Sequence, residues 1–465
     1  MPTLLVKNGI VATASEAFQA DIQAVDGVIT KIASSIDEPA DRVVNAEGKI
    51  VVPGGIDGHT HFEMPSMGTT TADDFKTGTI SAAAGGITSI LDFVLPQRGE
   101  SMRAALQKWQ DKASPKVLID YGFHMTCREN GDEAVKEIKE VIAAGVTSFK
   151  AYTTYRSQGL MLEDGAILAV MKEVSSNGGL LAVHAENNGI IEHNIETFKK
   201  EGKLSADYHP LAKPPIAEGE AVQRMILFAK STGANLYIVH LSTRMGREFV
   251  RDAQKGGWPI FAETCPHYLV FNDLVYKRSD APRFVMSPPL KSEEDRLALW
   301  DGIIEGDIRT IGSDHADFSS EQKEMGKDDF TLIPNGVPGT EVIMPVLFTE
   351  GFSKKRISIN RFVQVTSTNA AKAYNLYPRK GTIAVGSDAD MVIIDPSYKA
   401  RLTADFLHAK IDYSIYENYV TEGYPIMTIS RGDIIVEENQ LVATEGRGRF
   451  LPRKPYLNNK SPLFQ

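Results

Sequence analysis

The chain has 465 residues, of which 42% are hydrophobic and 24% charged, and its net charge is −10. This length exceeds what one hydrophobic core usually supports, so we expect one large domain and one smaller domain. The acidic balance argues against binding to nucleic acid or to an anionic membrane surface. Only two cysteines, Cys127 and Cys265, are present, which excludes a disulfide framework and favours a reducing compartment. Since the chain has neither a signal-peptide core nor a membrane-spanning apolar run, we expect a cytoplasmic location.

Both ends of the chain are typical of short strands joined by tight turns. In residues 1–51, Asn8-Gly9 and Asp26-Gly27 each lie between β-favouring runs, which is a strong local signal for a hairpin. The same pattern returns in residues 376–445. Neither segment offers much core by itself, so we predict that the two meet in one small β-sandwich domain. Residues 446–465 then form a C-terminal arm, which carries five basic residues and no acidic one.

Residues 52–375 alternate between β-like and helix-like stretches, which predicts a parallel sheet. The strand candidates are residues 50–56, 87–94, 117–124, 146–152, 180–184, 236–240, 259–263 and 308–313. The helical candidates have apolar residues at three- and four-residue spacing and are residues 101–113, 132–143, 164–176, 218–231, 245–255 and 293–304. Eight strands predict an α/β fold with a (β/α)8 TIM-like barrel, and the rival is an open doubly wound sheet. We favour the barrel because candidate metal ligands follow several different strands.

The first barrel strand leads into a His-x-His pair, His59 and His61. In an extended chain the two side chains point to the same face, because side chains alternate with a period of two. Asp57 would share that face, so the three side chains could chelate a divalent cation. Such a pair by itself is more often found at a surface or hydrogen-bonded in a core.

Further polar side chains follow later strands, each after an apolar run. A single one is more often a buried polar group with ordinary partners, but several together converge where barrel enzymes keep their active sites. Four imidazoles and a carboxylate form a site for a borderline-soft dication. The candidate ligands are His59, His61, Lys150, His184, His240 and Asp314.

Lys150 is the unusual member of this set, because a lysine normally titrates near 10.4 and its ammonium repels a dication. One interpretation is a salt bridge to Asp314 or to another acid. The other is that burial favours the neutral amine, which captures carbon dioxide as a carbamate that bridges two metals about 3.5–4 Å apart. The residues alone leave both interpretations open.

Other histidines have simpler interpretations. His315 neighbours Asp314 and should therefore point away from the metal face. His124 and His267, near the ends of two strands, could support the ligands from behind. Surface or structural roles are expected for His193, His209 and His408.

Motifs along nearly the whole chain resemble the cyclic amidohydrolase branch of the amidohydrolase superfamily, closest to the dihydropyrimidinase and hydantoinase group. The motifs are GGIDGHTHF, SFKAY, AVHAE, IVHLS, ETCPHYL, MSPPL, GSDHADF and GSDADMVIID. The resemblance implies that His59, His61 and Asp314 bind the more buried of two metals, usually zinc. It implies that His184 and His240 bind the second, and that carboxylated Lys150 bridges the two.

The same resemblance implies an activity, which is hydrolysis of a cyclic amide bond by a metal-bridging hydroxide to give an N-carbamoyl amino acid. Tyr155 would polarise the scissile carbonyl, and Asp314 would carry the proton to the leaving nitrogen. Ser287 and Asn335 match positions whose backbone groups hold the ring amide. A pocket for the ring substituent could be lined by Met64, Tyr152 and Leu160, for which core packing is an equal alternative. The resemblance also implies a homotetramer, or dimer of dimers, with the C-terminal arm docked on a neighbouring subunit.

Three alternatives compete with this interpretation. A dihydroorotase usually follows its His-x-His pair with an arginine, but Phe62-Glu63-Met64 stands here, so we rank that function low. An allantoinase would have the same metal site. A scaffold like the collapsin response mediator proteins would have lost metal ligands, whereas all six positions are intact in this chain.

Overall fold

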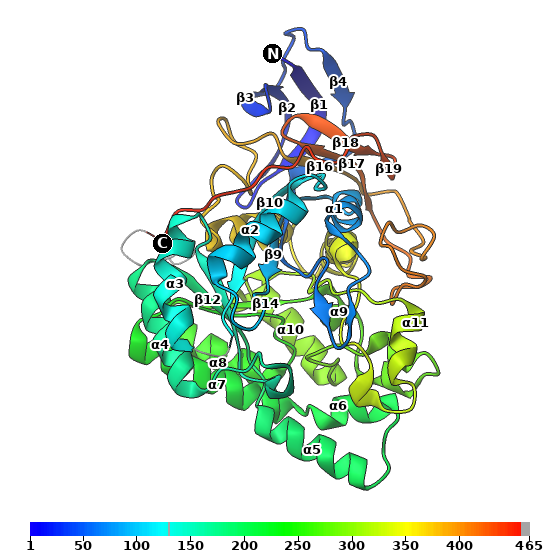
Figure 1. The fold of residues 1–465 in the computed structure, drawn as a ribbon. Helices are drawn as coiled ribbons and strands as arrows, with labels where there is room; N and C mark the ends of the chain where they lie inside the picture. Colours follow the sequence, from blue (N-terminus) through cyan, green and yellow to red (C-terminus); the bar gives the residue numbers. More distant parts are fainter. Residues whose placement is uncertain (129–130, 457–465) are drawn as a thin grey trace.

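The computed structural model describes residues 1–128 and 131–456 (Figure 1). Its centre is a sheet of eight parallel strands in sequential order, each connection crossing back through helical segments. The strands are β6 (Gly55–Thr60), β9 (Ile87–Val94), β10 (Asp120–Thr126), β11 (Ser148–Tyr152), β12 (Leu180–His184), β13 (Leu236–Ile238), β14 (Ile260–Thr264) and β15 (Thr310–Ile311).

The sheet closes into a barrel where the segment after β15 meets β6. Thr60 and His315 form a parallel bridge, and the His61 amide donates to the His315 carbonyl at 2.9 Å. This closure confirms the predicted (β/α)8 barrel and excludes the open doubly wound sheet. It also brings the carboxyl ends of the strands, where the candidate ligands lie, to one mouth.

Helices surround the barrel, and the six predicted ones are present with bounds close to those expected. Local chemistry explains several ends: α10 begins with a capping box between Ser292 and Asp295 and ends at Gly306, whose φ is +102°. No helix of residues 1–128 and 131–456 is long and apolar enough to cross a membrane. The helices are α1 (Phe75–Ala84), α2 (Met102–Ala113), α3 (Gly131–Ala143), α4 (Asp164–Ser176), α5 (Asn188–Lys200), α6 (His209–Ala212), α7 (Pro215–Thr232), α8 (Arg244–Lys255), α9 (Pro266–Val270), α10 (Glu293–Glu305), α11 (Ser320–Lys323), α12 (Ile343–Leu347), α13 (Ile359–Val363) and α14 (Asn369–Ala373).

The two ends of the chain meet, as predicted, and they form a second, mixed sheet. Figure 1 shows its blue N-terminal strands beside orange and red strands from the C-terminal part. The two parts join where β5 pairs antiparallel with β16. Side chains from both parts form a separate core. The strands are β1 (Thr3–Ala12), β2 (Ala17–Val25), β3 (Val28–Ala33), β4 (Arg42–Asn45), β5 (Ile50–Pro53), β16 (Met391–Asp395), β17 (Tyr424–Ser430), β18 (Asp433–Glu437) and β19 (Gln440–Leu441).

Two local predictions were wrong. The predicted strand 50–56 is two strands, because β5 belongs to the terminal sheet and β6 to the barrel. The chain crosses between them at Gly54, where a Cβ atom would lie 2.1 Å from the Thr88 hydroxyl. The predicted hairpin at Asn8-Gly9 is instead a bulge inside β1, since the left-handed φ of Asn8 (64°) serves a bulge as well as a turn.

The described part of the C-terminal arm packs on its own barrel. The Leu451 amide donates to the Tyr121 carbonyl at 2.7 Å, and the Tyr456 amide donates to the Gly178 carbonyl at 2.8 Å. Residues 446–456 thus contact the floor of their own barrel, and docking of the arm on a neighbouring subunit, which the family resemblance implies, stays a prediction. Residues 457–465 of the arm lie outside the described residues.

Arg453 ties the arm to the barrel floor. This residue is 3% exposed, and its guanidinium donates to the Ser148 hydroxyl at 2.7 Å and to the Phe123 carbonyl. Burial lowers the pKa of Arg453 to about 10, so the group stays charged at neutral pH.

We therefore expect Arg453→Met to lower the free energy of unfolding by about 1.5–3 kcal/mol, because buried partners of a charged donor are left unsatisfied. Arg449→Met, four residues earlier at an exposed position, is the matched control, and it should change the free energy of unfolding little. Denaturant titration of both variants measures the difference. Equal stabilities would contradict the role given to Arg453.

Candidate metal centre

All six predicted ligands line one pocket at the mouth of the barrel, which we call the central pocket: His59, His61, Lys150, His184, His240 and Asp314. They come from five different strands or from the residues that directly follow them. His240 and Asp314 have left-handed backbone conformations, with φ of 38° and 49°. Such strained positions in non-glycine residues are typical of functional sites.

Asp314 lies between the two histidines of the His-x-His pair. Its Oδ1 atom is 3.1 Å from Nε2 of His59 and 3.2 Å from Nε2 of His61. The centroids of the His184 and His240 rings are 4.5 Å apart. The centroid of the His240 ring is 5.4 Å from that of the His59 ring. Potential ligand atoms of His59, His240 and Asp314 lie within 4.8 Å of one another, so His240 joins the cluster around Asp314 to the His184 ring.

The charges around His59 suit a cation. Burial opposes a proton on His59, but Glu263 and Asp314 outweigh burial and raise its pKa to about 9. The carboxylates thus draw positive charge to this point, and a metal dication would satisfy the same demand. The buried Nδ1 of His240 also has no hydrogen-bond partner among the described residues. The residues present therefore fit a metal site.

Lys150 lies fully buried in the same pocket. Its ammonium nitrogen is 4.8 Å from the centroid of the Phe93 ring and 5.3 Å from that of Tyr152. Burial lowers the pKa of Lys150 to about 8, although Asp314 and Glu263 oppose the shift. The salt bridge to Asp314 considered from the sequence is not formed between the described residues.

Glu263, the next-to-last residue of β14, orients His59. Its Oε1 lies 2.6 Å from Nδ1 of His59, and its Oε2 accepts a hydrogen bond from the Tyr237 hydroxyl at 2.9 Å. Because Glu263 holds the Nδ1 proton, His59 can offer Nε2 to a metal in the pocket. We did not identify Glu263 from the sequence, although it ends a predicted strand just as the ligands do.

A second buried network holds His184. Oε2 of Glu186 is 2.8 Å from Nε2 of His184 and 3.2 Å from the ammonium of Lys213. Lys213 also donates to the Ser287 hydroxyl at 2.6 Å and lies 5.3 Å from the centroid of the Tyr155 ring. Lys213 therefore connects a candidate ligand with candidate substrate-binding residues. It directly follows α6 and precedes α7, away from any strand end, so strand position could not reveal it.

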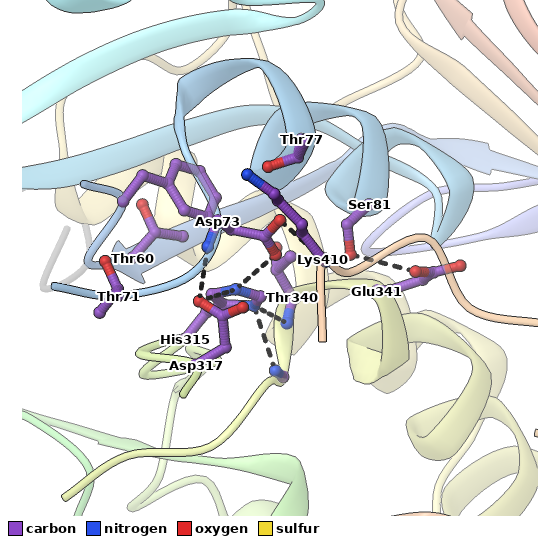
Figure 2. A network of polar contacts seen from close by, with 12 residues as sticks. Thr60, Thr71, Asp73, Thr77, Ser81, His315, Asp317, Thr340, Glu341 and Lys410 are labelled. Carbon is purple, nitrogen blue, oxygen red and sulfur yellow. Dashed lines mark hydrogen bonds and ion pairs between the residues drawn. The ribbon is translucent and has the colours of Figure 1, made fainter. Parts of the chain in front are cut away.

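His315 points away from the pocket, as predicted, into the network shown in Figure 2. Its Nε2 lies 3.1 Å from Asp73 and 3.4 Å from Asp317. Its Nδ1 accepts from the backbone amides of residues 339 and 340 at 3.3 and 3.4 Å, so the proton lies on Nε2. These three side chains are close enough to ligate a metal, but the imidazole already bonds to the acids and to the backbone. The network instead fixes the backbone beside Asp314.

Asp57 does not belong with the ligands, contrary to the sequence interpretation. Its Oδ1 accepts hydrogen bonds from the amides of His59 at 3.1 Å and Ser313 at 3.0 Å. It therefore joins the first strand of the barrel to the segment after the last one.

The other histidines support the structure. His124 stacks on Phe93 with centroids 4.5 Å apart, and Phe93 in turn contacts the rings of His59 and His61, so His124 supports these ligands from behind as predicted. His267 is buried against Tyr268, with centroids 4.3 Å apart. His193 is exposed, whereas His209 and His408 form hydrogen bonds with Met286 and Glu341.

The predicted substrate-binding residues share the central pocket with the ligands: Tyr155, Ser287, Asn335, Met64, Tyr152 and Leu160. The Tyr155 ring lies 5.1 Å from that of His184. Burial raises the pKa of Tyr155 well above its ordinary value, and Glu186 adds to the shift. Its hydroxyl therefore remains a hydrogen-bond donor at neutral pH.

Comparisons with known proteins agree with this geometry. The model of the family described as Amidohydrolase family matches residues 50–435. A D-hydantoinase of Geobacillus stearothermophilus is 39% identical over 458 residues, covering 98% of this chain and 97% of that protein. A dihydropyrimidinase of Rattus norvegicus is 38% identical, covering 97% and 89%. The crystal structure of a dihydropyrimidinase from Brevibacillus agri NCHU1002 superposes with a TM-score of 0.96 at 39% identity, covering 98% of this chain and 99% of that chain.

The contact between Glu263 and His59 predicts a metal-binding defect. Glu263→Gln keeps the size of the side chain but removes its charge, so metal affinity should fall about 10- to 100-fold. Competition with a chelator, followed by metal analysis, measures this affinity. Glu248→Gln, at an exposed ion pair on α8, is the control and should bind metal normally. Unchanged affinity in Glu263→Gln would show that His59 does not need this partner.

Proposed function

The chain belongs to the amidohydrolase family and is a cyclic amidohydrolase, and we propose that it opens hydantoin and dihydropyrimidine rings at an amide bond. The product would be an N-carbamoyl amino acid. The observation that carries this proposal is the convergence of all six ligand positions with Tyr155, Ser287 and Asn335 in one pocket. A scaffold protein would not need these groups together, so we rank the scaffold alternative below the enzyme.

The ligands would hold two divalent ions. By our proposal His59, His61 and Asp314 hold one, His184 and His240 hold the other, and carboxylated Lys150 joins the two. This set has four imidazole nitrogens and few oxygens, which supports zinc as the bound metal. When bound, such ions lower the pKa of a coordinated water and polarise a carbonyl oxygen.

The side chains of the protein would supply the remaining steps. Tyr155 keeps its proton and can donate a hydrogen bond to the carbonyl oxygen as negative charge develops there. Asp314 begins as an anion, because contacts with His59 and His61 hold its pKa well below the usual range although burial opposes this. It would take a proton from the attacking water and deliver it to the leaving ring nitrogen. Backbone groups of Ser287 and Asn335 would hold the ring amide in place.

The buried environment of Lys150 favours a carbamate over a salt bridge. A neutral amine is the form that attacks carbon dioxide, and burial lowers the pKa of Lys150 to about 8. Attack forms the N–C bond and releases the amine proton, which leaves an anionic group with two oxygens. Such a group removes the conflict between a buried ammonium and two metal ions.

We also propose a homotetramer in the cytoplasm. Both cysteines are unpaired and buried, which supports a reducing compartment. Light scattering of the full chain tests the tetramer, and a monomeric mass would contradict it.

A metal and substrate panel tests the proposed function. Chelation should abolish ring opening, and zinc, manganese or cobalt should restore it. Dihydrouracil, hydantoin, 5-substituted hydantoins and allantoin should be assayed in parallel under the same conditions. The expected result is opening of a hydantoin or of dihydrouracil. Activity on allantoin alone would contradict the proposal and identify the protein as an allantoinase. Full activity without bound metal would contradict the metal centre.

Substitution of Lys150 tests the carbamate. Lys150→Ala should lose most activity and at least one metal, and short carboxylic acids should partly restore it by filling the vacated bridge. Lys150→Arg should be inactive, because the guanidinium keeps its charge. Two bound metals and near-normal turnover in Lys150→Arg would contradict the bridge.

The pH dependence of metal loading provides a second measurement. In the metal-free wild-type protein at constant dissolved carbon dioxide, reconstitution should speed up as pH rises and level off above about 8. The reason is that the neutral fraction of a group with this pKa rises about tenfold per pH unit below it. A rate of metal loading that does not depend on the concentration of carbon dioxide would contradict the carbamate.

A further inference from the structure

A second depression adjoins the central pocket, and we call it the basic groove. It lies between the hairpin of β7 (Pro65–Ser66) and β8 (Thr69–Thr70), helix α2, and the turn near Gln158. Six residues line both the groove and the central pocket: Pro65, Ser66, Met67, Leu95, Gln158 and Leu160. These shared residues form a neck, so a substituent on a ring bound at the metals can extend through it into the groove.

The charged side chains that line the groove are cations. Lys108, Lys112 and Arg128 line it, and none of its lining residues in the described parts of the chain is acidic. The whole chain, by contrast, has a net charge of −10. The cations of the lining thus contrast with the general charge of the protein, and the acids nearest to the two lysines, Glu63 and Glu100, lie outside the lining.

The two lysines retain the capacity to bind an anion. Lys112 lies 3.7 Å from Glu63, and Lys108 lies 3.9 Å from Glu100, distances longer than a hydrogen bond. Lys112 is also 4.7 Å from the centroid of the Trp109 ring, which holds its ammonium at the groove. The side chains of Lys108 and Lys112 are 45% and 29% exposed, so a ligand can reach them.

Arg128 has a different role at the neck. Its guanidinium donates to the carbonyls of Pro96, Gln158 and Gly159 at 3.0–3.2 Å. It thereby joins the segment after β9 to the turn near Gln158, and it adds its charge to the groove. Because removing it would also loosen the neck, it is not a suitable position for a test.

We propose that the basic groove binds an anionic group at the end of the ring substituent, so that preferred substrates carry a carboxylate there. This inference rests on the proposed function. The apolar neck residues Leu95, Leu160 and Met67 suit a short aliphatic link between ring and carboxylate. The carboxylate created by ring opening forms at the metals and not in the groove, so a product with a neutral substituent gives these lysines no partner.

Two hydantoins of nearly equal size provide the test. One carries a carboxyethyl group at carbon 5, and the other carries its carbamoylethyl isostere. In the wild-type enzyme, kcat/KM should favour the carboxylate by about fivefold to tenfold at low salt. The preference should shrink as ionic strength rises, because these charges are partly exposed to solvent.

The double variant Lys108→Gln/Lys112→Gln should lose this preference while it keeps its kcat/KM for the carbamoylethyl compound. Lys172→Gln removes the same charge from an exposed position on α4, and it should leave the preference unchanged. Equal activity of the wild type on both hydantoins, or an unchanged preference in the double variant, would overturn the groove proposal alone. If the wild type opens neither hydantoin nor dihydrouracil, the proposed function fails and the groove proposal fails with it.

Discussion

The site depends on carboxylates that are buried next to imidazoles. Asp314 lies between His59 and His61, and Glu263 holds His59 from the opposite side. Burying these anions is costly unless a positive charge is near. The same interactions that orient the histidines therefore create the demand for a cation. The strand order of the barrel matters mainly because it brings these groups to one mouth.

The support for this arrangement is distributed over distant parts of the sequence. His315 bonds to Asp73 and Asp317 and keeps the backbone beside Asp314 in place (Figure 2). Lys213 joins Glu186 to Ser287, so one buried cation contacts both the side that holds His184 and the side expected to hold substrate. Such networks are rigid only when every member has its partner.

Much of this could be predicted from the sequence, because the information was local or periodic. The strands Ile87–Val94 and Leu180–His184 and the helix Asp164–Ser176 have the predicted bounds, since an apolar run or a helical spacing defines each of them. The six candidate ligands could be picked out because polar residues end buried strands. Glu263, Glu186 and Lys213 were missed because their roles depend on partners that only the closed barrel supplies. The residues near Gly54 misled us, since one apolar run serves two sheets.

The floor of the barrel has a consequence for how the protein is made. Arg453 donates to Ser148, which bonds to His124, and His124 stacks on Phe93 beneath the paired histidines. A residue near the end of the chain thus completes the support of a site whose first ligand lies near the beginning. Likewise β5 finds its partner β16 more than 300 residues later. During synthesis on the ribosome, the middle of the terminal sheet cannot be completed before β16 has emerged, and the barrel floor cannot be completed before Arg453 has emerged. A chain that stops before Arg453 would lack the support that this residue gives to the site.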